Sequence, residues 1–122
     1  MLIRYKKAME KIAMGLLSFM PEQKELKKLL ETMQCYEQCE DWQLYLYKKD
    51  DVYIGAIGVR IEDTKAVIQH ITVIPSYRGE GVGTEMVAEL CKLNTFTEVR
   101  AMDDQQPFIQ KCKSLLTEEQ TI

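Results

Sequence analysis

The chain has 122 residues, of which 46% are hydrophobic and 29% are charged. This length predicts one domain over residues 1–122, since two separate cores would each be too small to be stable. Sixteen Lys and Arg residues against nineteen Asp and Glu residues give a net charge of −3, which disfavours nucleic acid or an anionic membrane as the main partner. No apolar run is long enough to cross a membrane, and we expect a cytoplasmic protein.

The first forty residues predict a short strand followed by two helices. Residues 2–6 alternate between apolar and polar side chains, as an edge strand does. Apolar residues then recur at helical spacing over 9–20. Pro21 is expected to open a second amphipathic helix, whose apolar face carries Leu26, Leu29, Leu30 and Met33.

From Trp42 onward the apolar period changes to two, which is typical of strands. Strands are predicted from Trp42 to about residue 47, over 52–60 and over 66–73, and the short polar turns between them indicate an antiparallel meander. A helix follows at about 81–93, then a strand at 98–102 and a last helix containing Phe108, Ile109 and Cys112. This order indicates an α/β or α+β fold with one sheet covered by helices.

The four cysteines do not form a recognisable metal site. Cys35 and Cys39 lack the two-residue spacing of a zinc knuckle, and the only histidine, His70, is far away in sequence. We therefore expect no metal and reduced, mostly buried thiols, as in a cytosolic protein.

The most informative segment is the glycine-rich loop between the strand that ends at Val73 and the helix that follows. Gly79, Gly81 and Gly83 alternate with other residues there. Glycines let backbone N–H groups point into a concavity, and the N-terminus of the helix adds unpaired donors. The loop thus predicts a cradle for a phosphate or pyrophosphate.

Two common phosphate-binding loops fit poorly. A Walker A loop needs a lysine before its Ser or Thr, and Gly83 precedes Thr84 directly. A dinucleotide-binding turn needs a different glycine spacing and a β-α-β unit, whereas a β-meander precedes this loop. Residues 78–83, Arg-Gly-Glu-Gly-Val-Gly, instead follow the pattern Arg/Gln-x-x-Gly-x-Gly, with Val73-x-Pro75 just before it. This segment resembles the coenzyme A signature of the GNAT N-acetyltransferase superfamily, and the element order is similar to that family from residue 2 to about 116.

The resemblance implies a mixed, mostly antiparallel sheet flanked by helices, with the C-terminal strands abbreviated. It implies acetyl-CoA or CoA as the cofactor. The strand residues Ile71, Thr72 and Val73 would contact the pantetheine arm and the acetyl group. The pyrophosphate would be held by Arg78, Gly79, Glu80, Gly81, Val82, Gly83 and Thr84.

The sequence offers one candidate for the catalytic base. Acetyl transfer to an amine needs a base, and His70 is the only side chain whose ordinary pKa lies near neutrality. Simple alternation puts His70 on one strand face with Ile68 and Thr72; the alternative is a strand histidine without a catalytic role. The family often places a tyrosine acid in its last helix, where this sequence has Ile109.

Other titratable or aromatic candidates have structural interpretations as well. Glu62 and Asp63 look like a turn, and Asp103 and Asp104 like a helix cap. The strand tyrosines at positions 45, 47 and 53 would either stack on an acceptor or form ordinary cross-strand packing.

Three functional hypotheses follow. The first is an acetyl-CoA-dependent N-acetyltransferase acting on a small-molecule or protein amine. The second is a catalytically weak or silent CoA-binding regulatory domain, and the third a module that binds another diphosphate. The chain also resembles short GNAT-like proteins encoded in riboflavin operons, which implies a link to riboflavin metabolism. An unpaired sheet edge near residues 98–102 suggests a homodimer.

Overall fold

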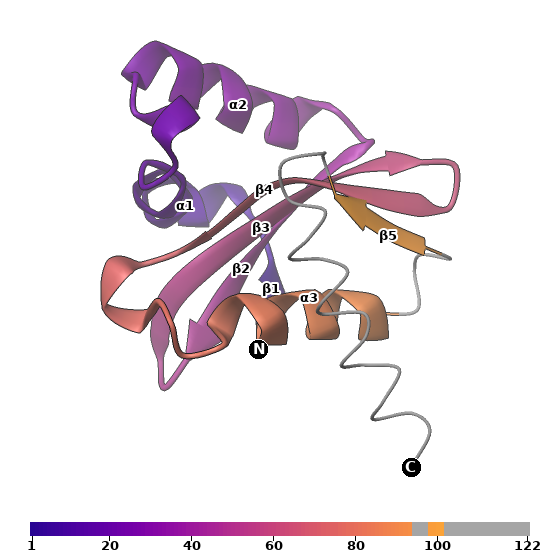
Figure 1. Cartoon of the computed structure of the whole chain (residues 1–122). Helices are drawn as coiled ribbons and strands as arrows, with labels where there is room; N and C mark the ends of the chain where they lie inside the picture. Colours follow the sequence, from indigo (N-terminus) through magenta and orange to yellow (C-terminus); the bar gives the residue numbers. More distant parts are fainter. Residues whose placement is uncertain (94–97, 102–122) are drawn as a thin grey trace.

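The computed structural model describes residues 1–93 and 98–101. These residues form one five-stranded sheet with helices on both of its faces (Figure 1). In chain order the strands and α-helices are β1 (Leu2–Arg4), α1 (Glu10–Leu17), α2 (Leu26–Gln38), β2 (Trp42–Lys49), β3 (Val52–Glu62), β4 (Lys65–Val73), α3 (Val82–Lys92) and β5 (Glu98–Ala101). Three short 3-10 turns complete the described elements: η1 (Lys7–Met9), η2 (Pro21–Gln23) and η3 (Pro75–Tyr77).

The predicted fold class and meander are confirmed. The strands lie in the order β1-β2-β3-β4-β5. The pairs β1–β2, β2–β3 and β3–β4 are antiparallel, and the pair β4–β5 is parallel. The sheet is therefore mixed and mostly antiparallel. The predicted last helix, with Phe108, Ile109 and Cys112, lies outside the described residues, as do Asp103 and Asp104.

The first helical segment ends at Leu17 and is shorter than predicted, and Pro21 prevents the helix from continuing through Met20. The residue before a proline is pushed out of the helical region, and Met20 has φ −80 and ψ 133. After α1, the amides of Phe19 and Met20 donate hydrogen bonds to the carbonyls of Leu16 and Leu17, three residues earlier in each case. This spacing is that of a 3-10 turn and not of an α-helix. Pro21 then opens the turn η2 instead of the second helix, which begins at Leu26.

Both hairpins of the meander turn on aspartates. Asp50 and Asp51 have φ values of 52 and 65 between β2 and β3, and Asp63 has φ 58 between β3 and β4. Aspartate tolerates this left-handed region better than most residues. Asp63 lies in the turn as predicted, whereas Glu62 is the last residue of β3 and pairs with Lys65.

The sheet separates two hydrophobic cores. Helices α1 and α2 cover one face and α3 covers the other (Figure 1). Leu44 and Leu46 of β2 face α1 and α2, whereas Tyr45 and Tyr47, which alternate with them, face α3. The period of two in the sequence thus decides which layer each side chain enters.

A β-bulge in β4 breaks this alternation. Gly58 of β3 pairs with His70 and Val59 pairs with Ile68, so Gln69 has no partner in β3. Ile68 packs in the α3 core, while His70 hydrogen-bonds to Tyr36 of α2 on the opposite face. The prediction that Ile68 and His70 share a face is therefore wrong, because the extra residue moves His70 to the other layer.

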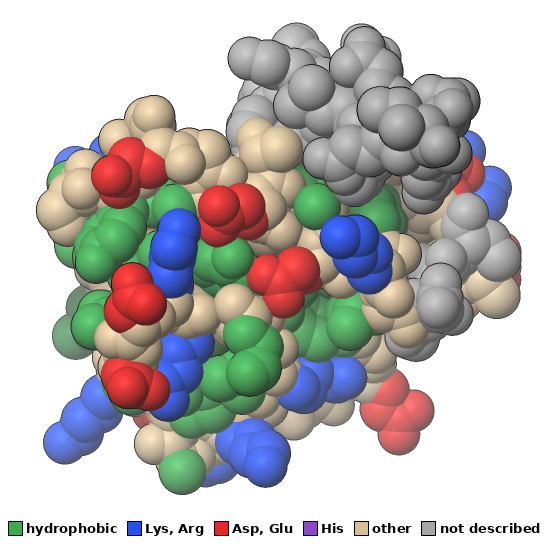
Figure 2. Space-filling view, turned by 90° about the horizontal axis from the view of Figure 1, so that it is seen from below, with side chains coloured by type: hydrophobic (Ala, Val, Ile, Leu, Met, Phe, Trp, Pro, Cys, Tyr) green, Lys and Arg blue, Asp and Glu red, His purple; other side chains and the backbone are tan. Residues whose placement is uncertain are grey.

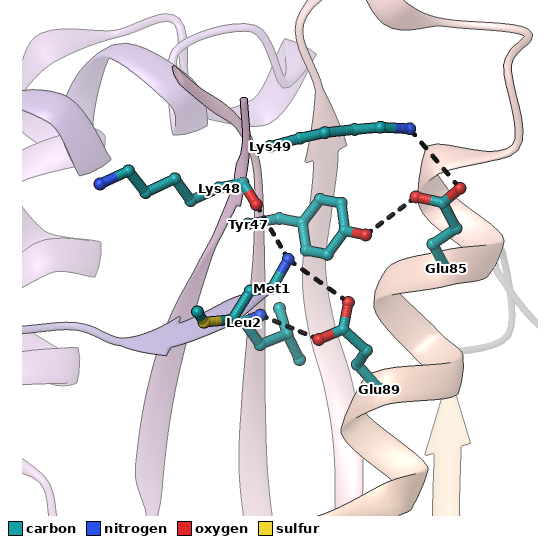
Figure 3. A network of polar contacts seen from close by, with 7 residues as sticks. All are labelled: Met1, Leu2, Tyr47, Lys48, Lys49, Glu85 and Glu89. Atoms are coloured by element: carbon teal, nitrogen blue, oxygen red, sulfur yellow. Dashed lines mark hydrogen bonds and ion pairs between the residues drawn. The ribbon is translucent and has the colours of Figure 1, made fainter. Parts of the chain in front are cut away.

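Carboxylates of α3 fasten the helix to the first two strands (Figure 3). Glu89 accepts a hydrogen bond from the Leu2 amide at 3.2 Å and lies 3.5 Å from the Met1 ammonium. One turn earlier, Glu85 accepts from the Tyr47 hydroxyl at 2.8 Å. Burial, followed by the hydrogen bond to Glu85, raises the pKa of Tyr47, so its hydroxyl remains a donor at any ordinary pH.

We expect Glu89→Ala to lower the free energy of unfolding by about 1 kcal/mol, because the partly buried Leu2 amide loses its acceptor. Glu89→Gln keeps an acceptor oxygen and loses only the charge, so it should cost less than half as much. Urea denaturation of the two variants measures the difference. An equal loss in both would show that the Met1 ion pair, and not the Leu2 hydrogen bond, is what matters.

On the described part of the α3 side, acidic and basic side chains are intermixed and do not gather by sign (Figure 2). None of the helices in the described ranges is both long and apolar enough to cross a membrane.

Candidate functional site

A cavity of about 590 Å³ lies where the C-terminal end of β4 meets the glycine-rich loop. Three segments line it: residues 19–21 between α1 and η2, residues 71–73 of β4, and residues 77–84 of the loop and first turn of α3, apart from Glu80. Segments from both sides of the sheet thus meet in one site. Phe19, which is 41% exposed, presents an apolar ring there.

The cavity brings together nearly all the residues expected to bind a cofactor. Ile71, Thr72 and Val73 line it, and so do the predicted loop residues Arg78, Gly79, Gly81, Val82, Gly83 and Thr84. Glu80 is the exception: it is exposed and does not line the cavity. The roles of these residues stay predictions, but their placement in one cavity is what a common ligand requires.

The strand wall of the cavity is the C-terminal end of β4. Within the described residues, β4 pairs with β5 from Lys65–Glu98 to Ile68–Ala101. Gln69 follows as the bulge, and its side-chain Nε2 is buried without a hydrogen-bond partner among the described residues. From Ile71 onward, β4 lines the cavity, so this end of the strand is presented to a ligand.

The N-terminus of α3 forms an anion cradle. Gly79 and Gly81 have φ values of +83 and +80, and a Cβ atom at either would meet nothing within 4 Å. Backbone conformation, and not lack of space, therefore explains these glycines. The first helical hydrogen bond runs from the Glu85 amide to the Gly81 carbonyl at 3.0 Å. The backbone amides of a first helical turn lie ahead of the intrahelical ladder, and those of Val82 and Gly83 at the start of α3 suit a phosphate oxygen.

Arg78 connects the cradle to the strand. Its Nε donates a hydrogen bond to the Val73 carbonyl at 2.9 Å, which closes the loop between β4 and α3. The exposed guanidinium is held at the rim of the cavity, where its positive charge adds to the positive end of the helix dipole. Both features favour a ligand that carries negative charge.

His70 is buried behind the cavity and does not line it. Its Nδ1 lies 2.6 Å from the Tyr36 hydroxyl, and its Nε2 lies 3.3 Å from Nε2 of Gln23. Both ring nitrogens are thus within hydrogen-bond reach of buried side chains. The role of His70 as a base stays a prediction, and it requires one of these contacts to open.

None of the three strand tyrosines considered for the acceptor lines the cavity. Tyr45 and Tyr47 are buried in the α3 core, with hydroxyls bonded to Gln43 and Glu85. Tyr53 packs against the core under α1 and α2. Ordinary packing accounts for all three.

The cysteines that fall within the described residues carry no disulfide. Cys35 and Cys91 are half-buried, but Cys39 is exposed, which corrects the expectation of mostly buried thiols. Burial is the largest cause raising the pKa of the Cys35 thiol. A raised pKa makes this thiol a poorer nucleophile at neutral pH.

Sequence reasoning missed the wall opposite the strand. Phe19, Met20 and Pro21 belong to the end of an amphipathic helix, where apolar residues normally signal a core. Tyr77 was missed although it lies next to the glycine-rich motif. Gln23 is only 1% exposed, but its place in the first turn of the second predicted helix, where polar residues are ordinary, gave no signal that it is buried.

Residues 10–98 match the Acetyltransferase (GNAT) family. The chain is 51% identical over 114 residues to an "Uncharacterized N-acetyltransferase in lysA 3'region" of Bacillus methanolicus. The aligned residues make up 93% of this chain and 95% of the relative. The chain belongs to the GNAT acetyltransferase family.

Solved structures share the fold at low sequence identity. The aminoglycoside acetyltransferase AAC(6')-Iy, in complex with a bisubstrate analogue of CoA and acetylneamine, has a TM-score of 0.74 and 18% identity, covering 95% of this chain and 88% of that chain. A transcriptional regulator from Bacillus halodurans has a TM-score of 0.66 and 13% identity, covering 95% of this chain and 90% of that chain.

Proposed function

We propose that the protein is an N-acetyltransferase that takes the acetyl group from acetyl-CoA and transfers it to a small-molecule or protein amine. One observation carries the proposal: the anion cradle at the start of α3 and the end of β4 line a single cavity. A CoA thioester has a diphosphate and a long arm, so it needs these two surfaces side by side. The family to which the chain belongs adds support.

Each part of the cavity has a distinct binding task in this proposal. The amides of residues 82–84 and the Arg78 guanidinium hold the diphosphate. The edge of β4 from Ile71 to Val73 aligns the arm, with apolar contacts from Phe19 and Met20 on the opposite wall. Acetyl-CoA supplies an activated acyl group there, and the resemblance to the family assigns the Val73 amide to polarise its carbonyl.

A second candidate function is a CoA-binding regulatory domain with weak or no catalysis. Two observations favour it over a typical family member: Ile109 stands where the family often has a tyrosine acid, and both ring nitrogens of His70 contact buried side chains. A fold neighbour described as a transcriptional regulator gives this alternative a precedent in shape only.

Two measurements separate these functions. Calorimetry with CoA, acetyl-CoA and ATP tests the site, and we expect the two CoA compounds to bind and ATP to bind much more weakly. A thiol-release assay with acetyl-CoA and a panel of amines then tests catalysis. Release above the amine-free rate supports the transferase, whereas CoA binding with background release for every amine supports the regulatory domain. Tighter binding of ATP than of CoA contradicts both.

The acceptor is a separate question. Resemblance to RibT, a GNAT-like protein of riboflavin operons, leads us to include amine-bearing intermediates of flavin synthesis in the amine panel. Turnover with those amines above all others supports a link to riboflavin metabolism, and turnover only with unrelated amines argues against it. We also propose that the chain forms a homodimer. Sedimentation equilibrium of the full chain, with and without CoA, tests this by measuring whether its mass in solution is that of one chain or of two.

A further inference from the structure

Four buried polar side chains are connected to one another, and two of them, Gln23 and His70, lie close in sequence to residues that line the cavity. Gln23 at the end of η2, Thr32 and Tyr36 of α2, and His70 of β4 are between 1% and 9% exposed. The Thr32 hydroxyl donates to Oε1 of Gln23 at 2.9 Å. Gln23 in turn contacts one nitrogen of His70, and Tyr36 contacts the other. We call these four residues the polar strut.

The polar strut joins the two facing walls of the cavity. Gln23 lies two residues after Pro21, the last residue of one wall, and His70 immediately precedes Ile71, the first residue of the other. The 3.3 Å contact between Gln23 and His70 is therefore a short polar link from wall to wall. Thr32 fixes the carboxamide of Gln23, and Tyr36 fixes the imidazole.

The surrounding structure is shaped to admit this link. Tyr36 lies over Gly58, the cross-strand partner of His70, and a Cβ atom at Gly58 would lie 1.9 Å from the Tyr36 hydroxyl oxygen. Burial raises the pKa of Tyr36, so its hydroxyl stays neutral. Buried polar groups are costly unless they are bonded. A bonded set of four fixes directions and distances that apolar packing leaves looser.

We propose that the polar strut sets the spacing between residues 19–21 and the end of β4, so that Gln23, Tyr36 and His70 act as positioning residues for the pantetheine arm of CoA. This inference rests on the proposed function. In the proposed function the cradle at α3 holds the diphosphate through backbone groups of the glycine-rich loop, and the strut belongs to other elements of the fold. Loss of the strut therefore weakens binding of the arm and leaves binding of the nucleotide end intact.

The test compares two ligands by calorimetry: CoA, and 3′-phosphoadenosine 5′-diphosphate, which is the nucleotide end of CoA without its arm. Tyr36→Phe and Thr32→Val each remove one hydrogen bond of the strut at nearly constant shape. We expect each substitution to weaken CoA binding by about tenfold. The dissociation constant of the nucleotide should stay within about twofold of the wild-type value. Thr32→Ser keeps the hydroxyl and should bind CoA as wild type does.

Tyr45→Phe is the matched control, because it removes a buried tyrosine hydroxyl on the α3 side that is bonded only within β2. Its affinity for CoA should not change. All variants are measured well below their unfolding temperature. Equal weakening of both ligands, or unchanged CoA binding in Tyr36→Phe and Thr32→Val, would overturn the inference while leaving the proposed function in place. A wild-type protein that binds neither ligand would remove both.

Discussion

Replacing Gly81 by aspartate is expected to weaken CoA binding by about 100-fold or more, because a carboxylate in the cradle opposes the diphosphate at short range. Gly81 immediately precedes α3 as its N-cap with φ +80, and a Cβ atom there meets nothing within 4 Å. Aspartate tolerates this left-handed backbone better than most residues. The variant should therefore fold, and the lost affinity should come from the site itself.

Gly81→Asn is the matched variant, because asparagine has the shape of aspartate and the same tolerance of positive φ, but no charge. We expect it to weaken CoA binding by about tenfold or less. Calorimetry on both variants, with circular dichroism as a check of folding, gives the comparison. If aspartate and asparagine weaken binding by the same factor, backbone strain and not charge is responsible. If neither weakens it, the diphosphate lies elsewhere.

Replacing Gly58 by alanine is expected to lower the free energy of unfolding by about 3 kcal/mol, the cost of overpacking plus a disturbed buried hydrogen bond. The new methyl group would lie 1.9 Å from the Tyr36 hydroxyl oxygen and 2.4 Å from the ring carbon that bears it. The ring has little room to retreat, since it packs edge-on against Trp42 and contacts His70. Chemical denaturation measures the loss.

Gly15→Ala provides the control in the same chain. Gly15 is exposed in the middle of α1, and a Cβ atom there meets nothing within 4 Å, so alanine should stabilise the protein by about 0.5–1 kcal/mol. In a Tyr36→Leu background the cost of Gly58→Ala should fall by at least half, because the clashing ring is gone. An unchanged cost in that background would mean that contact with Tyr36 is not the cause.

The sequence predicted the elements well because local patterns decide them. The change of period at Trp42, the polar turns at 48–51 and 62–65, and the glycine-rich loop are contiguous signals. Each placed its element within a few residues. The loop was the best-predicted part of the site for the same reason: the cradle is built from backbone groups of one short stretch, whose glycines are visible in the sequence.

What the sequence did not predict depends on contacts between distant segments. The bulge at Gln69 appears only when β4 is paired with β3, so counting residues along the strand put His70 on the wrong face. The wall formed by Phe19 and Pro21 requires knowing how the chain turns after α1. The polar strut requires knowing which of the two faces α2 covers.

The bulge also determines which changes of length the fourth strand can accept. On either side of Gln69 the pairing with β3 is regular, with Ile68 opposite Val59 and His70 opposite Gly58. Deleting Gln69 alone would join two regular ladders and keep every neighbouring side chain in its own layer. Deleting a strand residue away from the bulge would turn the side chains on one side of the deletion toward the opposite layer. Among relatives of this chain, a strand one residue shorter should therefore lack Gln69 and run straighter past the cavity.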